Sequence, residues 1–148
     1  MSSNKTILLV EDNPSDADLT RRALLKGRVS NELVVVEDGQ EALDYLRGEG
    51  AYTGRNVAET PAVILLDLKL PKISGLEVLR QIRANARLRR VPVVILTSSK
   101  EEEDVGAGYD LGVNSYVRKP VDFKEFQIAI ENLGLYWLIL NEPNPPVK

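Results

Sequence analysis

Short apolar runs alternate with amphipathic segments along the whole of the 148-residue chain. The runs are rich in Val, Ile and Leu, and they read TILLV (6–10), ELVVV (32–36), AVILL (62–66), VPVVIL (91–96) and, more weakly, NSYV (114–117). Runs of this length and composition predict buried β-strands. The segments between and after them repeat apolar residues at helical spacing and cover 15–26, 39–47, 75–85, 101–112 and 123–140. The pattern therefore predicts five strands and five helices in alternation.

Strands that are apolar throughout and alternate with helices indicate a parallel sheet that is covered on both faces. We therefore predict a doubly wound α/β fold in a single domain, which the chain length allows. Two segments depart from the alternation. Loop 48–61 is long for a helix-to-strand connection, and the three prolines of segment 141–148 cannot continue a helix. We expect a domain over residues 5–140, followed by a proline-rich tail over 141–148.

The composition excludes several kinds of chemistry, because the chain has neither Cys nor His. Disulfides, thiol nucleophiles, Ser-His-Asp triads and most zinc sites are ruled out. The net charge is −3, and the basic segment RANARLRR (83–90) has no interleaved aromatic residues, so we expect no direct nucleic-acid binding. No apolar stretch resembles a signal-peptide core or approaches the roughly 20 residues of a membrane helix. We expect a cytoplasmic protein without a membrane partner.

Polar residues that directly follow the predicted strands form the candidate site. Glu11 and Asp12 follow the first strand, and Asp67 ends the third. Thr97 follows the fourth strand and Lys119 the fifth. Because the carboxyl ends of parallel strands lie along one edge of the sheet, we expect these side chains to converge there. Burying an unpaired carboxylate is energetically costly. We therefore expect the third strand to end at Asp67 and to place its side chain at an edge or in a cleft.

These side chains together suit phosphoryl transfer. Glu11, Asp12 and Asp67 could hold Mg²⁺, which prefers carboxylate oxygens and keeps several waters. With the charge neutralised, one carboxylate can attack phosphorus and form an aspartyl phosphate. The hydroxyl of Thr97 and the ammonium of Lys119 would then contact the phosphoryl oxygens. Each residue taken singly also has a structural explanation, such as a helix cap, but their joint placement favours the functional interpretation.

The chain resembles the receiver domain of two-component response regulators over residues 5 to about 140. The resemblance is carried, in the family's order, by VEDNP (10–14), DLKLPKISG (67–75), LTSS (96–99) and YVRKP (116–120). It implies the flavodoxin-like (βα)5 fold with strand order 2-1-3-4-5. It also implies that Asp67 accepts phosphate from the phosphohistidine of a partner kinase. Mg²⁺ would be bound by Glu11 and Asp12 together with Asp67 and the backbone carbonyl of Lys69.

The resemblance assigns roles to three further residues. Thr97 and Lys119 bind the phosphoryl group, and Tyr116 turns inward as part of the switch. A protein of this kind is a signalling protein that catalyses only its own phosphotransfer and dephosphorylation. Loop 48–61 and the ending ENLGLYWLILNEPNPP (131–146) are similar to stand-alone regulators that partner cyanobacterial phytochrome histidine kinases. The resemblance thus implies a sensor histidine kinase as partner and a place in phytochrome light signalling.

Two other functions remain open on the sequence. A receiver-like module could bind partners without phosphotransfer, although every expected site residue is present. A Mg²⁺-dependent phosphatase of the haloacid dehalogenase type also uses an aspartate nucleophile, but it needs a second acid two residues on, where this chain has Lys69. A flavin carrier or a P-loop nucleotidase would need a phosphate-binding loop that the sequence lacks.

The last predicted helix carries more apolar surface than packing against one face of a sheet requires. Its stretch LGLYWLIL (133–140) is apolar or aromatic on nearly every side and includes Tyr136 and Trp137. Exposed apolar patches usually mark interaction sites, and Trp and Tyr are favoured anchors in them. We therefore expect a homodimer with Tyr136 and Trp137 in the interface. The alternative is that the tail 141–148 folds back over this surface.

Overall fold

The computed structural model describes residues 6–27, 29, 31–97, 115–119 and 121–132, with the main chain alone for Thr97, Ser115, Tyr116, Arg118, Ile130 and Asn132. The strands are β1 (Ile7–Val10), β2 (Leu33–Val36), β3 (Val63–Asp67), β4 (Val93–Thr97) and β5 (Ser115–Arg118). The helices are α1 (Pro14–Lys26), α2 (Gly39–Arg47), α3 (Gly75–Ala84) and α5 (Phe123–Asn132), with a short 3-10 helix, η1 (Gly50–Tyr52).

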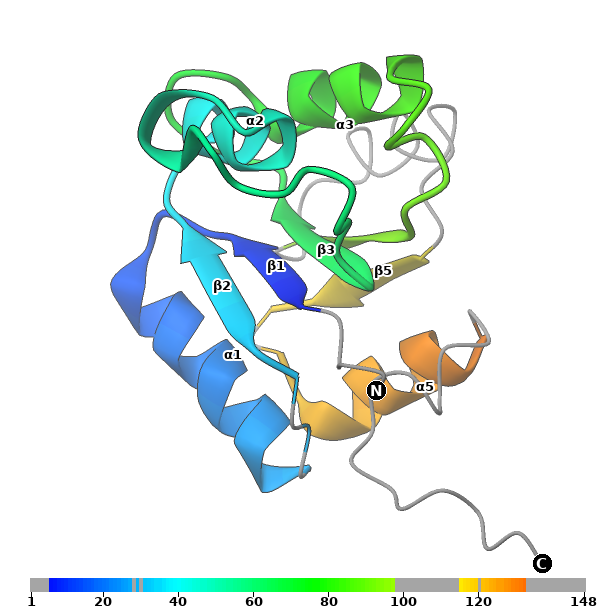
Figure 1. Cartoon of the computed structure of the whole chain (residues 1–148). Coiled ribbons are helices and arrows are strands. Elements are labelled where there is room, and N and C mark those ends of the chain that lie inside the picture. Colours follow the sequence, from blue (N-terminus) through cyan, green and yellow to red (C-terminus); the bar gives the residue numbers. More distant parts are fainter. Residues whose placement is uncertain (1–5, 28, 30, 98–114, 120, 133–148) are drawn as a thin grey trace, which may run out of the picture.

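The strands form one parallel sheet in the order β2-β1-β3-β4-β5. Helices α2 and α3 cover one face of the sheet, and α1 and α5 cover the other (Figure 1). The predicted doubly wound α/β fold and its strand order are confirmed. The order reverses next to β1, so the ends of β1 and β3 lie side by side at the point where ligands bind in such sheets.

The hydrophobic core lies in two layers, one on each face of the sheet. Along β1, Ile7 and Leu9 pack toward α1 and α5, whereas Leu8 and Val10 pack toward α2 and α3. All four side chains are fully buried. A strand buried on both faces explains why the chain reads as continuous apolar runs rather than as an alternating pattern.

Local capping signals determine where the helices begin and end. The side chains of Asn13, Asp38 and Ser74 each accept a hydrogen bond from the backbone N–H three residues on, which caps α1, α2 and α3. Pro14 begins α1, where its missing N–H is not needed. Gly48 ends α2 with a left-handed φ of 69°. These three helices match their predicted limits within one residue.

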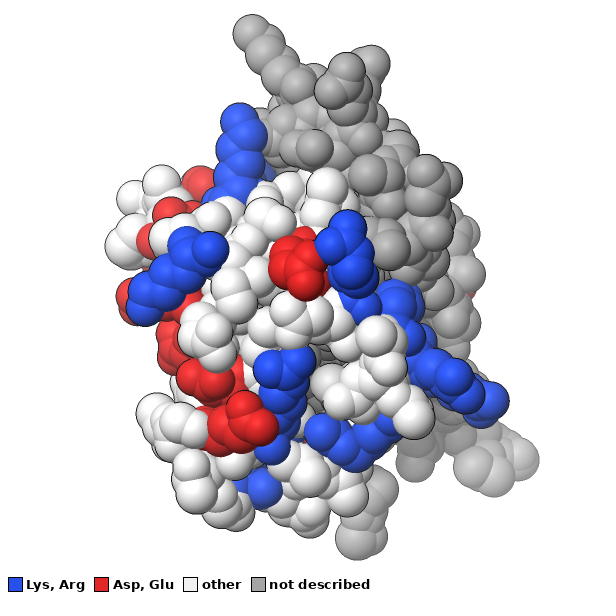
Figure 2. Space-filling view, turned by 90° about the horizontal axis from the view of Figure 1, so that it is seen from above, with Lys and Arg blue, Asp and Glu red and all other residues white. Residues whose placement is uncertain are grey.

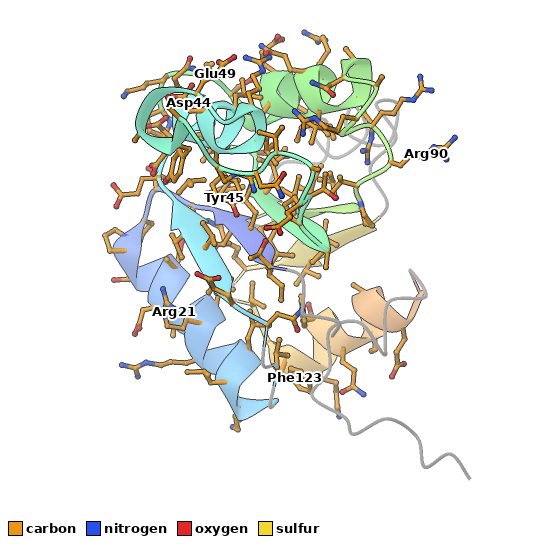
Figure 3. The ribbon with its side chains drawn as sticks, viewed as in Figure 1. Arg21, Asp44, Tyr45, Glu49, Arg90 and Phe123 are labelled. Atoms are coloured by element: carbon orange, nitrogen blue, oxygen red, sulfur yellow. The ribbon has the colours of Figure 1, made fainter. Side chains whose placement is uncertain are left out.

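Loop 48–61 is packed against α2. The rings of Tyr45 and Tyr52 meet edge to face, with centroids 5.1 Å apart, and the Arg55 guanidinium lies 4.1 Å from the Tyr45 ring centroid. Figure 3 shows Tyr45 below α2, on the side that faces the sheet. The Tyr52 hydroxyl donates to Glu41 Oε2 at 2.7 Å. The length of this loop is therefore accommodated by ordered contacts with α2.

The basic segment 83–90 uses two of its arginines to hold the main chain together. Arg87 donates to the carbonyls of Leu46 and Val57 at 3.2 and 3.0 Å, and it thereby joins the segment to α2 and to loop 48–61. Arg83 donates to the carbonyl oxygens of Arg89 and Val91. Figure 2 shows this side of the molecule, where several Lys and Arg side chains lie next to one another and most of the Asp and Glu side chains gather on the opposite side.

Two expectations fall outside the described residues. The predicted fourth helix, 101–112, and the apolar stretch 133–140 with Tyr136 and Trp137 both lie there, as does the tail 141–148. The fourth helix and the dimer surface therefore stay predictions. Among the helices that the structure describes, none has the length and apolar character needed to cross a membrane.

Candidate functional site

Three of the predicted site residues meet at the carboxyl edge of the sheet. Glu11 follows β1, Asp67 ends β3 and Lys119 follows β5. The Lys119 ammonium lies 3.0 Å from Asp67 Oδ2 and 3.1 Å from Glu11 Oε1. Lys119 thus bridges two carboxylates that the central strands place side by side.

The two bridged carboxylates are almost completely buried. Glu11 is 1% exposed and Asp67 is 4% exposed, whereas their neighbour Asp12 is exposed. Each buried carboxylate accepts a second hydrogen bond, since the backbone N–H of Asn13 donates to Glu11 and that of Lys69 donates to Asp67. Buried carboxylates are tolerated only with such partners, so the arrangement depends on Lys119 and on these two N–H groups.

Asp16 belongs to the same cluster, although it was not among the site residues predicted from the sequence. Its Oδ2 lies 3.1 Å from Lys119 Nζ, and its backbone N–H is held by the side chain of Asn13. In the sequence Asp16 looks like an ordinary acidic residue in the first turn of a helix. The only signal for it was its place one turn after the acidic pair Glu11 and Asp12.

The charges in this cluster shift the pKa values of its members. Burial, and then the negative charge of Asp67, raise the pKa of Glu11 to about 7, despite the opposing effect of Lys119. Burial by itself lowers the pKa of Lys119, but the hydrogen bonds and charges of Asp67 and Glu11 outweigh this and raise it above its ordinary value. Lys119 therefore stays charged, and the site carries more negative charge than one lysine neutralises.

Glu11, Asp12 and Asp67 have the geometry of a divalent-metal site. Each places one carboxylate oxygen within 4.8 Å of the others. Oxygen ligands in small number suit Mg²⁺ or Mn²⁺, and a divalent cation would balance the excess negative charge. The residues present therefore fit a divalent metal ion.

A cavity of about 260 Å³ opens beside the cluster, between α1 and β2. It is lined by Glu11, Asp12, Pro14, Ala17, Asp18, Arg21, Val35 and Glu37. Figure 3 shows Arg21 on α1 at this side of the molecule. Because two of the three candidate metal ligands line the cavity, it connects the acidic cluster with the solvent.

The turn after β3 holds Asp67 against the start of α3. The backbone N–H of Gly75 donates to the carbonyl of Leu68 at 3.0 Å. A Cβ atom at Gly75 would lie 2.4 Å from the carbonyl oxygen of Asp67, a distance that real Cβ atoms do not reach. The motif therefore requires glycine at position 75, because α3 begins in contact with the backbone of Asp67.

Two predicted site residues are described by their main chain alone. Thr97 ends β4, one position beyond Leu96, which pairs with Asp67 of β3. Tyr116 of β5 pairs with Ile95 of β4. Their side chains lie outside the described residues, so the roles expected for them stay predictions.

Comparisons with known proteins agree with this arrangement. Residues 7–131 match the protein family described as the response regulator receiver domain. The response regulator Rcp1 of Synechocystis sp. (strain ATCC 27184 / PCC 6803 / Kazusa) is 40% identical over 134 residues, which cover 90% of this chain and 89% of Rcp1.

Solved structures of response regulators have the same fold. The bacteriophytochrome response regulator RtBRR aligns with a TM-score of 0.85 and 58% identity, covering 97% of this chain and 86% of its own. The phosphorylated cyanobacterial phytochrome response regulator RcpA aligns with a TM-score of 0.75 and 44% identity, covering 92% and 95%. The Mn²⁺-bound form of Rcp1 aligns with a TM-score of 0.73 and 40% identity, covering 90% and 94%.

Proposed function

Because the chain belongs to the response regulator receiver family, we propose that Asp67 accepts a phosphoryl group in a Mg²⁺-dependent reaction and that the phosphorylated protein signals through contacts with other proteins. The observation that carries the proposal is the place of Asp67. It is a buried carboxylate at the end of β3, 3.0 Å from the Lys119 ammonium and grouped with Glu11 and Asp12. A nucleophile, a cation and a candidate metal site thus occupy one edge of the sheet.

Each residue of the cluster has a chemical task in this proposal. Glu11, Asp12 and Asp67 hold the metal, and the backbone carbonyl of Lys69 is the remaining protein ligand that the family resemblance implies. Bound Mg²⁺ supplies positive charge at the oxygens of the transferred group. Lys119 contacts a phosphoryl oxygen, because its ammonium already points at Asp67 and stays charged.

The phosphoryl group must come from outside the chain, since the chain has no His. We propose a sensor histidine kinase as the donor. As Asp67 forms a bond to phosphorus, the phosphorus–nitrogen bond of the kinase phosphohistidine breaks. The relatives RtBRR and RcpA are named as phytochrome response regulators, which supports a phytochrome as the kinase and light as the signal.

Asp67→Asn tests the phosphoacceptor directly. The variant keeps the shape of the side chain but removes the nucleophile, so acetyl phosphate with Mg²⁺ should add one phosphoryl group to the wild type and none to the variant, as read by intact mass. Asp44→Asn is the matched control, because Asp44 lies on α2 and lines neither the cluster nor the cavity, and it should react like the wild type. ATP with Mg²⁺ alone should leave the protein unmodified.

The same experiment separates the other functions. A wild type that takes up no phosphoryl group from acetyl phosphate or from a kinase would identify a binding-only module. Repeated hydrolysis of small phosphate esters would identify a phosphatase. Phosphorylation of Asp67→Asn at the wild-type rate would show that another residue is the acceptor.

We propose that Thr97 and Tyr116 carry the switch. The Thr97 hydroxyl moves toward the phosphorylated Asp67, and the Tyr116 ring turns into the space that Thr97 leaves. Two states of the surface formed by the predicted fourth helix, β5 and α5 then change in population. NMR of the Tyr116 ring with Mg²⁺ and beryllofluoride, which mimics the phosphoryl group, should show a changed environment. An unchanged ring environment would contradict the switch.

We also propose that a receiver domain over residues 5–140 forms a homodimer through Tyr136 and Trp137, with the tail 141–148 outside the domain. The surplus apolar residues of 133–140 support this, and Ile128 on α5 adds an exposed apolar side chain (52%) to the preceding turns. Light scattering after size exclusion should give twice the chain mass. Tyr136→Ala with Trp137→Ala should shift the protein toward the monomer. A monomeric wild type at tens of micromolar would favour a tail that covers the surface.

A further inference from the structure

The start of α2 lies in direct contact with the loop that follows Asp67. A Cβ atom at Gly39 would lie 2.3 Å from the carbonyl oxygen of Ile73 and 2.9 Å from both Ile73 Cβ and Val78 Cγ2. Gly39 is the first residue of α2, and it is buried. Only glycine allows the two segments to approach this closely, so the β3–α3 loop rests on the backbone of α2.

The residue before this contact has a conformation that fixes the loop further. Lys72 has φ 71°, and it is the one non-glycine residue with positive φ among those that the structure describes. The backbone N–H of Ile73 donates to the carbonyl of Pro71 at 2.8 Å, which closes a tight turn around Lys72. β-branched residues disfavour this left-handed region strongly. The conformation of Lys72 therefore determines where Ile73 meets Gly39.

The Lys72 side chain makes a weaker contribution. Its ammonium lies 3.4 Å from Asp38 Oδ2, but the side chain is 66% exposed, and such ion pairs contribute little. Asp38 itself caps α2, with its Oδ1 accepting from the Glu41 N–H at 2.7 Å. The position of the β3–α3 loop therefore depends mainly on the backbone conformation of Lys72 and only weakly on its charge.

The loop is fixed at its other end by the site itself. The Lys69 N–H donates to Asp67 Oδ1, and α3 begins where Gly75 contacts the Asp67 carbonyl. The segment from Asp67 to Gly75 thus has contacts at both ends and one against α2 between them. A shift of Ile73 therefore strains the short segment that joins it to Lys69 and Asp67.

We propose that Gly39 and Lys72 are positioning residues for metal binding and phosphorylation at Asp67. Neither touches the acidic cluster. Each holds the β3–α3 loop on the start of α2, and the loop in turn orients Asp67 and the backbone of Lys69. This inference rests on the proposed function of Asp67.

The first test compares Gly39→Ala with Gly54→Ala in the full chain. A methyl group at Gly39 must displace Ile73, so Mg²⁺ binding, measured by calorimetry, should weaken by about tenfold or more, as is typical when the support of a metal ligand is lost. Phosphorylation by acetyl phosphate should slow to a similar extent. Gly54 has φ 95° in loop 48–61, and a Cβ there meets nothing within 4 Å, so its variant carries backbone strain without touching the β3–α3 loop.

The second test uses Lys72, whose exposed side chain allows variants that fold. Lys72→Val opposes the left-handed backbone, and it should weaken Mg²⁺ binding as Gly39→Ala does. Lys72→Gly removes the same ion pair but accepts positive φ, so it should bind Mg²⁺ within about twofold of the wild type. Asp38→Asn keeps the helix cap without the charge, and it should also bind Mg²⁺ like the wild type.

Hydrogen exchange of the metal-free protein provides a readout that does not depend on phosphotransfer. The Ile73 and Gly75 amides should exchange faster in Lys72→Val than in Lys72→Gly. Wild-type Mg²⁺ affinity in folded Lys72→Val would overturn the positioning role, and so would equal losses in the Val and Gly variants. A wild type that binds Mg²⁺ but takes up no phosphoryl group would instead contradict the proposed function. The Mg²⁺ affinities of the Gly39 and Lys72 variants would still test whether these residues position the metal site.

Discussion

Lys119→Met should destabilise the metal-free protein more than any other single charge removal at the site. The change keeps most of the unbranched apolar part of the side chain but removes the cation that lies 3.0 Å from Asp67 and 3.1 Å from Glu11 and Asp16. Glu11 and Asp67 are 1% and 4% exposed, so water from the neighbouring cavity can replace the lost ammonium only in part. The variant therefore leaves two buried carboxylates side by side without a counter-ion.

The expected size follows from the burial of each partner. Breaking a fully buried ion pair costs roughly 3–5 kcal/mol of unfolding free energy. The Lys119 side chain is 16% exposed and that of Asp16 is 32% exposed, so we expect a smaller loss of about 2–4 kcal/mol. For a chain of this size that loss lowers the melting temperature by roughly 5–15 °C. Mg²⁺ at a hundred times its dissociation constant raises the free energy of unfolding by about 2.7 kcal/mol, which is comparable with this loss.

Thermal unfolding followed by circular dichroism, with and without Mg²⁺, measures both effects. Mg²⁺ should raise the melting temperature of Lys119→Met by more than that of the wild type, because the metal replaces a missing positive charge. Lys72→Met is the control: its ammonium is exposed and 3.4 Å from Asp38, so its loss should stay within about 1 kcal/mol. The prediction is wrong if Lys119→Met has the same melting temperature as Lys72→Met, or if Mg²⁺ raises the melting temperatures of both variants equally.

Two further predictions concern Tyr52 and Gly75. Burial, and then its hydrogen bond to Glu41, raise the pKa of Tyr52 to about 12, so the folded state keeps this phenol proton to higher pH than the unfolded state. The stability from this contact is complete below about pH 10 and is lost as the pH rises toward 12. In an ultraviolet pH titration, Tyr52→Phe should lack a phenol that ionises near pH 12 in the wild type, and an unchanged titration would contradict the assignment. Gly75→Ala should lose about 1–3 kcal/mol in urea unfolding, because its methyl group would collide with the Asp67 backbone; a variant as stable as the wild type would show that α3 can move away from Asp67.

The alternation of strands and helices, the limits of α1, α2 and α3 and the acidic and basic residues at the strand ends could all be predicted from the sequence. These signals are local. Asn13, Asp38 and Ser74 each cap a helix by bonding a backbone group three residues away, so the information lies within one turn. The family membership predicted from the motifs around Asp67 and Lys119 was confirmed for the same reason, since those motifs are short and continuous.

Tertiary structure alone decided which of these residues touch. Glu11 and Asp12 are neighbours in the chain, yet one is buried and the other exposed, because the chain leaves β1 at the sheet edge and only Glu11 points inward. Asp16 joins Lys119 across 103 positions because α1 folds back over the sheet. The contact of Gly39 with Ile73 likewise depends on how α2 packs beside the β3–α3 loop. Such contacts arise from the packing of elements far apart in sequence, and no spacing along the chain encodes them.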